Sequence, residues 1–441
     1  MAIFALHPNL HTMKYERINP ELFSYNRERF KAQMKSNSLV VFHSAELMPM
    51  SADATFPFRQ NPDIFYLTGI DQEETMLILF PDAPVEAYKE MLFIRKTNEV
   101  IAVWEGEKLT VQQAKEISGI KNIYIADEFE TLLKVLMNHV ETVYLNLNEH
   151  DRSSNGLPYK DLRFANELRE RFPLHNYKRA APIMESLRVI KSDIEIALLQ
   201  HSCNITEKAF RRVLKFVKPG VKEYEIEAEI MHEFLRNGAT DYAYYPIIAS
   251  GKDSCILHYD KNNKVCQDGE VLLFDFGCKY AGYDSDMSRT VPVNGRFTKR
   301  QKDVYNAVLR TMRHATSMLR PGVLIEEYHK EVGKFITSEM IALGLFTKAE
   351  VDAQDPKKPL YKKYFMHGTS HFLGLNTHDV GDRYKALKAG MVLTCEPGIY
   401  IPAERIGIRL ENDILLSHEN PIDLMANIPV EADEIEELMN A

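Results

Sequence analysis

The chain lacks the features of several large classes of protein. No run of about 18 or more apolar residues occurs in its 441 positions, so no membrane-spanning helix is predicted. The first 15 residues contain only a very short apolar run, no basic leader and no small-residue cleavage site, so we expect no signal peptide. There is no basic block, and the net charge is −9. Neither nucleic acid nor an anionic membrane is therefore expected as the main partner.

Cysteine is also scarce. The five cysteines are odd in number and show no CxxC spacing, which argues against a disulfide framework or a zinc site. We interpret them as reduced, buried thiols of a cytoplasmic protein. They are Cys203, Cys255, Cys266, Cys278 and Cys395.

The composition is otherwise that of an ordinary globular protein, with 45% apolar and 27% charged residues. The chain is long for a single hydrophobic core, so two domains are predicted. In residues 1–184, strand-like and helix-like segments interleave, which indicates an α/β domain. The predicted helices are 20–35, 110–118, 128–139 and 159–171, and the predicted strands are 39–43, 75–80, 90–94, 100–104, 122–125 and 142–147.

Two segments of this half fit neither pattern. Residues 50–69 are rich in aromatic side chains and polar turns, and we expect a packed loop or a surface for a neighbour. Residues 182–192 are interpreted as a hinge leading into a long helix, because Ser192, Asp193 and Glu195 supply an N-cap and an acidic first turn.

Residues 185–441 show an arrangement that repeats. A pair of helices is followed by antiparallel strands, and the same order then occurs again, which predicts an α+β domain with two related halves around a curved sheet. The predicted helices are 192–217, 222–236, 299–319 and 325–343, and the predicted strands lie around Ile256 and at 271–276, 284–293, 392–401 and 406–416.

The stretch 271–293, VLLFDFGCKYAGYDSDMSRTVPV, carries an unusual pair of acids. Asp275 lies in a short apolar run that predicts a buried strand, where a carboxylate is costly unless it is paired or bound to a cation. If the chain turns after Gly277, Asp275 and Asp286 face each other across an antiparallel pair. A solvated hairpin with two surface aspartates fits this stretch alone equally well.

Further acids and imidazoles follow downstream. His367, His371 and His378 lie within twelve positions beside glycines, a density that favours a functional loop over isolated structural histidines. Glu396 ends an apolar strand before a Pro-Gly pair. Arg409, two positions before Glu411, should point to the same face of a strand, where an ion pair exposed to solvent is the simplest interpretation of those two alone.

Taken together, the acids and one imidazole form a set rich in hard oxygen ligands, which suits Mn²⁺ and tolerates Co²⁺, Fe²⁺ or Zn²⁺. Five ligands are too many for one catalytic ion with an open position and enough for two ions that share carboxylates. Two ions about 3.5–4 Å apart can hold a bridging water and activate it, so the predicted chemistry is hydrolysis. The set is Asp275, Asp286, His371, Glu396 and Glu411.

The motifs around these residues resemble the five metal-ligand motifs of the pita-bread metallopeptidases, in type and order. They are DFG at Asp275, SDMSRT at Asp286, HGTSHFLG at His371, EPGIY at Glu396 and GIRLEND at Glu411. Residues 50–69 also resemble a segment of the N-terminal domain of aminopeptidase P. The resemblance implies an α/β N-terminal domain over residues 1–184 and a pita-bread catalytic domain of the creatinase/aminopeptidase type, with a curved antiparallel sheet, over 185–441.

Within this family, Xaa-Pro aminopeptidase (aminopeptidase P) is the most similar group. Methionine aminopeptidases lack the N-terminal domain, creatinases lack the acidic metal set, and prolidases of the mammalian type have a longer insertion after the EPG motif, whereas Gly398 and Gly407 are close here. The resemblance implies cleavage of peptides with proline in second position and assembly as a homodimer or homotetramer. A prolidase on the same scaffold, or a non-catalytic binding protein, remains an alternative.

The resemblance assigns a role to each member of the site. Asp275 and Asp286 would bind one ion and Asp286 would also bind the second, whose shell His371 completes. Glu411 would bridge both ions. Glu396 would lie beside the second ion and move a proton from the bridging water.

Six further roles follow from the same resemblance. Two histidines would act on the substrate, His258 by holding it near the scissile bond and His378 by stabilising the developing oxyanion. The remaining side chains would support the ligands or contact the proline side of the substrate: Arg409 and Tyr244 in the first role, His367 and Arg383 in the second.

Overall fold

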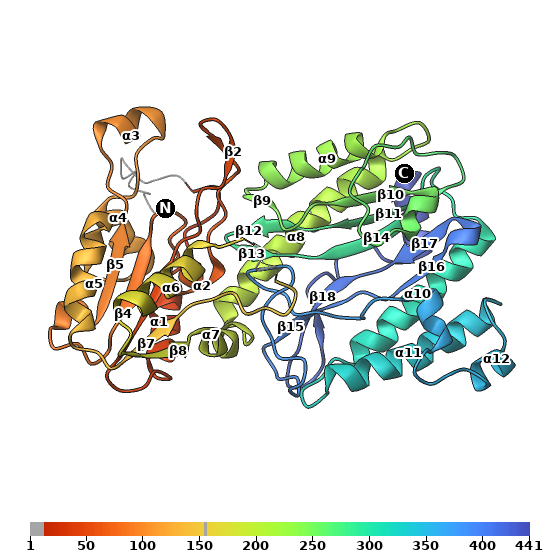
Figure 1. The fold of residues 1–441 in the computed structure, drawn as a ribbon. Coiled ribbons are helices and arrows are strands. Elements are labelled where there is room, and N and C mark those ends of the chain that lie inside the picture. Colours follow the sequence, from red (N-terminus) through yellow and green to blue (C-terminus); the bar gives the residue numbers. More distant parts are fainter. Residues whose placement is uncertain (1–12, 154–156) are drawn as a thin grey trace, which may run out of the picture. The chain divides into compact units, whose positions relative to one another are not determined.

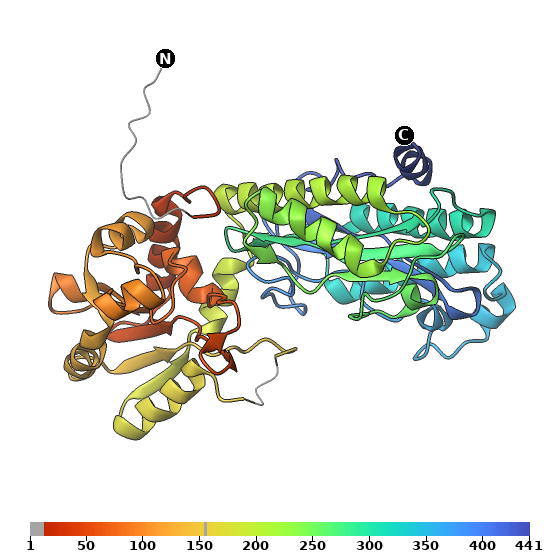
Figure 2. The same ribbon diagram turned by 90° about the horizontal axis from the view of Figure 1, so that it is seen from above.

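The computed structural model describes residues 13–153 and 157–441 (Figures 1 and 2). The prediction that no signal peptide is present concerns residues that lie mostly outside these ranges. The chain divides into two compact units, the first ending at Arg188 and the second spanning Val189–Ala441. Among the helices of the described residues, none has the length and hydrophobicity needed to cross a membrane.

The N-terminal unit is built on a six-stranded mixed sheet with the order β6-β5-β4-β1-β7-β8. The two central strands β1 and β4 are antiparallel, whereas β1, β7 and β8 run parallel to one another. Every residue of β1, β4 and β7 is buried, as expected for strands covered on both faces. The strands are β1 Ser38–His43, β4 Met76–Leu79, β5 Glu90–Ile94, β6 Ile123–Ile125, β7 Thr142–Leu145 and β8 Asn176–Arg179.

Helices cover this sheet, and the first begins where the sequence provides its signals. Pro20 occupies the first turn, and the Asn19 side chain accepts a hydrogen bond from the Glu21 N–H. The helices are α1 Pro20–Lys31, α2 Pro62–Thr68, α3 Glu99–Trp104, α4 Val111–Ser118, α5 Phe129–Met137, α6 Lys160–Arg171 and α7 Ala181–Arg188, and a small hairpin adds β2 Pro49–Ser51 and β3 Ala54–Thr55.

Two predictions for this unit are wrong, and a third is correct only in part. The strand predicted at 100–104 is helix α3, which the Asn98 side chain caps; none of its residues is buried, so no core selects the extended form. The segment 50–69, predicted as irregular, contains the β2–β3 hairpin and helix α2. The hinge predicted at 182–192 contains the boundary between the two units, but most of it is helix α7, whose residues Ile183, Met184 and Leu187 are buried.

The second unit repeats its order of elements, as predicted. Helices α8 and α9 pack against strands of the first half, and α10 against strands of the second (Figures 1 and 2). The first half comprises α8 Asp193–Phe216, α9 Glu223–Arg236, β9 Asp241–Tyr242, β10 Ile247–Ser250, β11 Val271–Phe276, β12 Cys278–Tyr280, β13 Tyr283–Asp284 and β14 Met287–Pro292. The second comprises α10 Lys299–Met318, α11 Ile325–Ala342, α12 Lys348–Asp352, β15 Val392–Cys395, β16 Gly398–Ile401, β17 Ile406–Arg409, β18 Asn412–Leu415, β19 Ile422–Asp423 and α13 Ala432–Met439.

Antiparallel strands position the site residues. β11 pairs with β10 on one side and with β14 on the other. Asp275 lies opposite Ser288. The prediction that Asp275 and Asp286 face each other directly across the strand pair is therefore wrong. Gly277 is required where the chain leaves β11, because a Cβ there would lie 1.7 Å from the Ser285 carbonyl oxygen. The strand predicted around Ile256 is absent from the described structure: β10 ends at Ser250, and Ile256 follows a short 3-10 helix.

Candidate metal centre and active site

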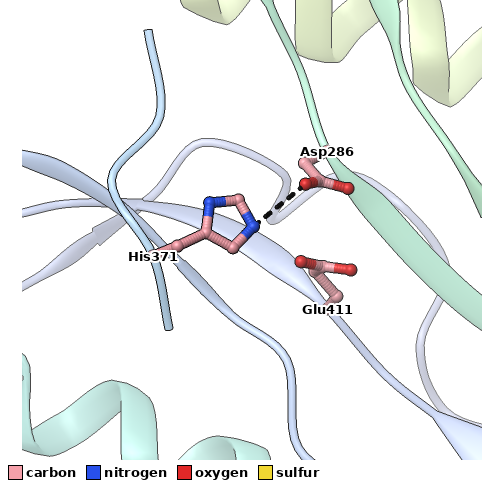
Figure 3. A group of neighbouring side chains, drawn as sticks. All are labelled: Asp286, His371 and Glu411. Atoms are coloured by element: carbon pink, nitrogen blue, oxygen red, sulfur yellow. Dashed lines mark ion pairs between the residues drawn. The ribbon is translucent and has the colours of Figure 1, made fainter. Parts of the chain in front are cut away.

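Three potential metal ligands converge in the second unit. The ligand atoms of Asp286, His371 and Glu411 all lie within 4.8 Å of one another (Figure 3). Asp286 directly precedes β14, Glu411 connects β17 to β18, and His371 lies in the loop before β15. The Nε2 atom of His371 is 3.3 Å from Asp286 Oδ2. Two strand pairs and one loop, distant in sequence, thus supply a compact set of oxygen and nitrogen donors.

Asp275 joins this set through a tyrosine. The Tyr244 hydroxyl lies 2.5 Å from one carboxylate oxygen of Asp275 and 2.5 Å from one of Asp286. Tyr244 therefore links the two aspartates, which are not direct cross-strand partners. Burial, followed by the negative charges of Asp275 and Asp286, raises the pKa of Tyr244 well above its usual value. The hydroxyl therefore stays protonated and can act as a hydrogen-bond donor.

Glu396 follows β15 and lies between two histidines. Its Oε1 is 3.8 Å from His371 Nε2, and its Oε2 is 3.5 Å from His367 Nδ1. His367 is also held by the Tyr400 hydroxyl, 2.8 Å from its Nε2. Burial, followed by the positive charge of Arg409, lowers the pKa of His367 to about 3, so this imidazole is neutral near pH 7.

Arg409 and Glu411 do not form the solvated ion pair that their spacing suggested. Both are buried, at 4% and 2% exposure. Arg409 instead donates hydrogen bonds to Asp275 Oδ2, at 2.5 Å, and to the Tyr400 hydroxyl, at 2.9 Å. It also donates to the Ser288 hydroxyl, which in turn donates to Glu411 Oε2. The guanidinium thereby fixes the orientation of one acid directly and of another through a serine.

The three remaining predicted residues lie on exposed loops. His378 faces His371 edge to face, with ring centroids 4.4 Å apart. His258 lies close enough to His367 for its charge to lower the pKa of that imidazole. Arg383 is exposed, and its guanidinium lies over the ring of Tyr384 at 5.2 Å from the centroid.

The electrostatics of the cluster favour a bound cation. Burial raises the pKa of Asp286 well above its usual value, and the charges of Asp275 and Asp413 raise it further. Burial likewise raises the pKa of Glu411, followed by the charges of Asp286 and Glu396. Buried carboxylates that repel one another are stable when a positive charge lies between them. The donors are oxygen-rich with one imidazole, so the residues present fit hard or borderline divalent ions.

Sequence reasoning missed three residues that support this set. Ser288 connects Arg409 to Glu411, Tyr400 contacts both Arg409 and His367, and the carboxylate of Asp413 accepts the backbone N–H of Asp286 at 3.1 Å. All three stand inside the motifs that identified the ligands. No local signal separates them from their neighbours, because their role depends on contacts with distant strands.

Comparison with known proteins gives the family. The profile of Metallopeptidase family M24 matches residues 197–418, and that of the aminopeptidase P N-terminal domain matches residues 23–144. The chain therefore belongs to metallopeptidase family M24. It carries an N-terminal domain of the aminopeptidase P type, and the family implies divalent metal ions.

Particular relatives sharpen this assignment. The Xaa-Pro aminopeptidase of Escherichia coli is 35% identical over 447 residues, with 96% of this chain and 98% of that protein covered. The Xaa-Pro aminopeptidase of Haemophilus influenzae is 34% identical, with the same two shares, 96% and 98%. The structure of E. coli aminopeptidase P with the inhibitor Pro-Leu matches with a TM-score of 0.85 at 33% identity, over 96% of this chain and 99% of that one. The predicted resemblance and the predicted fold, an α/β domain followed by a pita-bread catalytic domain, are confirmed.

Proposed function

We propose that the protein is an Xaa-Pro aminopeptidase, a metal-dependent exopeptidase that hydrolyses the bond between an N-terminal residue and a following proline. One observation carries the proposal: an M24 catalytic unit in which Asp286, His371 and Glu411 converge follows an aminopeptidase P N-terminal domain. The near full-length identity to two Xaa-Pro aminopeptidases supports the substrate class. No observation favours a prolidase or a non-catalytic protein.

The metal site we propose uses the whole acidic set. Divalent ions held there would polarise the scissile carbonyl and lower the pKa of a water molecule. We infer two ions, with Mn²⁺ as the preferred metal, from the number of oxygen donors. The ligands would be Asp275, Asp286, His371, Glu396 and Glu411.

Other residues would act on protons and on the substrate. Glu396 lies between His367 and His371, a place from which its carboxylate can take a proton from the attacking water and give it to the leaving nitrogen. His378, beside His371, would donate a hydrogen bond to the carbonyl oxygen as negative charge develops there. Arg409 and Tyr244 would hold the aspartates in place.

The proline side of the substrate sets the specificity. An Xaa-Pro bond is a tertiary amide without an N–H and with a fixed φ, so β-strand hydrogen bonding cannot select it. We propose that His367 and Arg383 contact this side and that His258 holds the substrate near the scissile bond. A homodimer or homotetramer and a cytoplasmic location also remain predictions.

The decisive experiment measures metal content and hydrolysis of Arg-Pro-Pro on one purified sample, before and after chelation and after return of Mn²⁺. We expect about two ions per chain and activity that is lost and regained with them. An Arg-Pro dipeptide run in parallel separates the alternatives. Cleavage of the dipeptide alone would identify a prolidase, and no metal with no turnover under any divalent ion would leave only a binding function.

A further inference from the structure

A buried ion pair includes the residue that follows His378, and neither of its members has a role in the mechanism above. The ammonium of Lys191 is 3.5 Å from Asp379 Oδ2, and each side chain is only 1% exposed. Lys191 lies two residues before the first residue of the long helix α8. Asp379 directly follows His378 in sequence. The pair therefore joins the start of the catalytic unit to the loop that carries the proposed oxyanion donor.

The loop itself is closed by backbone contacts. The Asp379 N–H donates to the Phe372 carbonyl at 2.9 Å, so the loop begins beside His371 and ends beside His378. This closure explains how two residues seven positions apart can bring their rings to an edge-to-face contact. This backbone hydrogen bond does not orient the Asp379 side chain. The ion pair with Lys191 does.

Neighbouring residues pack closely around the pair. A Cβ on Gly374 would lie 2.2 Å from Asp379 Oδ2 and 3.1 Å from the Lys191 ammonium, so only glycine leaves room for the carboxylate. The Lys191 backbone is fixed as well, because its N–H donates to the Gly390 carbonyl at 2.8 Å. Lys191 thus reaches Asp379 from an anchored position.

Stability alone does not account for such a pair. Removing two charges from water costs several kcal/mol per ion, and the attraction between them often only offsets that cost. A buried pair that is not needed for stability can still fix one conformation of the segment it holds. Here that segment ends at His378.

We propose that Lys191 is a positioning residue: through its ion pair with Asp379 it fixes the loop that presents His378 to the substrate. This inference rests on the proposed function, because it takes the oxyanion role of His378 from there. Because the pair holds the loop at its His378 end, we expect it to affect turnover and to leave metal affinity unchanged.

The test compares Lys191→Met with Lys302→Met, which removes a lysine of the same unit that lies 3.0 Å from Glu436. For Lys191→Met we expect kcat for Arg-Pro-Pro to fall about tenfold with little change in KM, because a small misplacement of a catalytic group lowers the rate. Metal affinity, measured by calorimetry, should match wild type. Lys302→Met should match wild type in kcat, KM and metal affinity.

A double-mutant cycle with His378→Ala separates positioning from a general loss of structure. His378→Ala should lower kcat about a hundredfold, as loss of an oxyanion donor does. If Lys191 acts through His378, adding Lys191→Met to that variant should change kcat by less than about twofold. A further tenfold loss in the double variant, or a parallel loss of metal affinity, would overturn the proposal.

Two more results keep the proposal testable. Asp379→Asn, which keeps the shape of the side chain, should reproduce the kcat loss if Lys191→Met does not fold; full activity of that variant would refute the role of the pair. Failure of the proposed function is a different result. In that case the wild-type protein itself would not cleave Arg-Pro-Pro when loaded with metal.

Discussion

The partly buried acids of the N-terminal unit and the acids of the proposed metal-ligand set are compensated in different ways. In the N-terminal unit, acids are matched by cations. Glu90 lies 3.3 Å from Arg27 and 2.7 Å from Lys31, and Asp63 lies 2.7 Å from Arg188. Each of these acids has a cation of the same unit beside it. Their negative charge is therefore compensated without a ligand.

The most buried acid of that unit, Asp161, has a histidine as its partner. Asp161 accepts a hydrogen bond from His43 Nδ1 at 2.9 Å, and the two side chains are 8% and 3% exposed. Burial raises the pKa of Asp161, and the hydrogen bond and charge of His43 lower it. The partner thus offsets part of the cost of burying the carboxylate.

In the catalytic unit the acids are concentrated instead. Arg409 pairs with Asp275, whereas Asp286 and Glu411 share the neighbourhood of one histidine, His371. The pKa of both acids is raised by burial and by neighbouring carboxylates. The contrast shows that side chains of the fold can neutralise acids elsewhere. Among the described residues, Asp286 and Glu411 lack such compensation by a paired lysine or arginine and are suited to bind cations from solution.

The largest effect on kcat is expected when proton transfer at this site is abolished. Glu396→Gln keeps the size of the side chain and removes its basicity, so kcat for Arg-Pro-Pro should fall about a thousandfold in a folded protein. Near-normal turnover would remove Glu396 from the mechanism.

Its neighbour supplies the control. Cys395 is fully buried, and burial raises the pKa of its thiol to about 12, so it stays protonated and offers no ligand. Cys395→Ser should therefore change kcat by less than about twofold. Complete loss of metal in that variant would contradict the oxygen and nitrogen ligand set.

The second effect breaks the compensation in the N-terminal unit. His43→Phe leaves the buried Asp161 with only the longer hydrogen bond from Asn61, at 3.3 Å, so the unfolding free energy in urea should fall by about 3 kcal/mol. Turnover per folded, metal-loaded chain should stay unchanged. Arg171→Met, which removes the exposed pair with Glu130, should cost less than about 1 kcal/mol. Equal costs for the two variants would erase the distinction between buried and exposed pairs.

The stability of the catalytic unit is expected to depend on pH through His329. Burial, followed by the charge of Lys362, lowers the pKa of His329 from 6.5 to about 4. Between these values the unfolded chain binds a proton that the folded unit does not, so stability falls as the pH drops through this window, by less than about 3 kcal/mol.

The variant His329→Gln should remove that part of the pH dependence, because the amide can still accept from the Thr369 N–H without titrating. Urea unfolding at a series of pH values measures it. His232→Gln, at a site with 49% side-chain exposure, serves as the control. If both variants keep the wild-type slope, His329 does not cause it.

The smallest effect sharpens the picture of the acidic set. Tyr244→Phe removes the hydroxyl that lies 2.5 Å from a carboxylate oxygen of both Asp275 and Asp286, so metal affinity should fall about tenfold with the ligands still present. Tyr245→Phe changes an adjacent side chain that is 68% exposed and should bind metal like wild type. Unchanged affinity in Tyr244→Phe would show that the aspartates need no such link.

The sequence by itself determined the elements whose signals are local. The limits of β11 follow from an apolar run between glycines, and the start of α8 follows from Ser192 and Glu195, which form a capping box. Asp275 could be singled out for the same reason, because a carboxylate inside an apolar run is unusual. The other candidate ligands could be named from their motifs.

Only the tertiary structure decided which residues meet. Residues 100–104 have the composition of a strand and form a helix, because no sheet accepts them in the core. Arg409 pairs with Asp275, 134 positions away, rather than with Glu411, and Lys191 reaches Asp379, 188 positions away. Local propensity is encoded over a few residues, whereas the partner of a buried charge is set by strand register and by the close packing of distant segments.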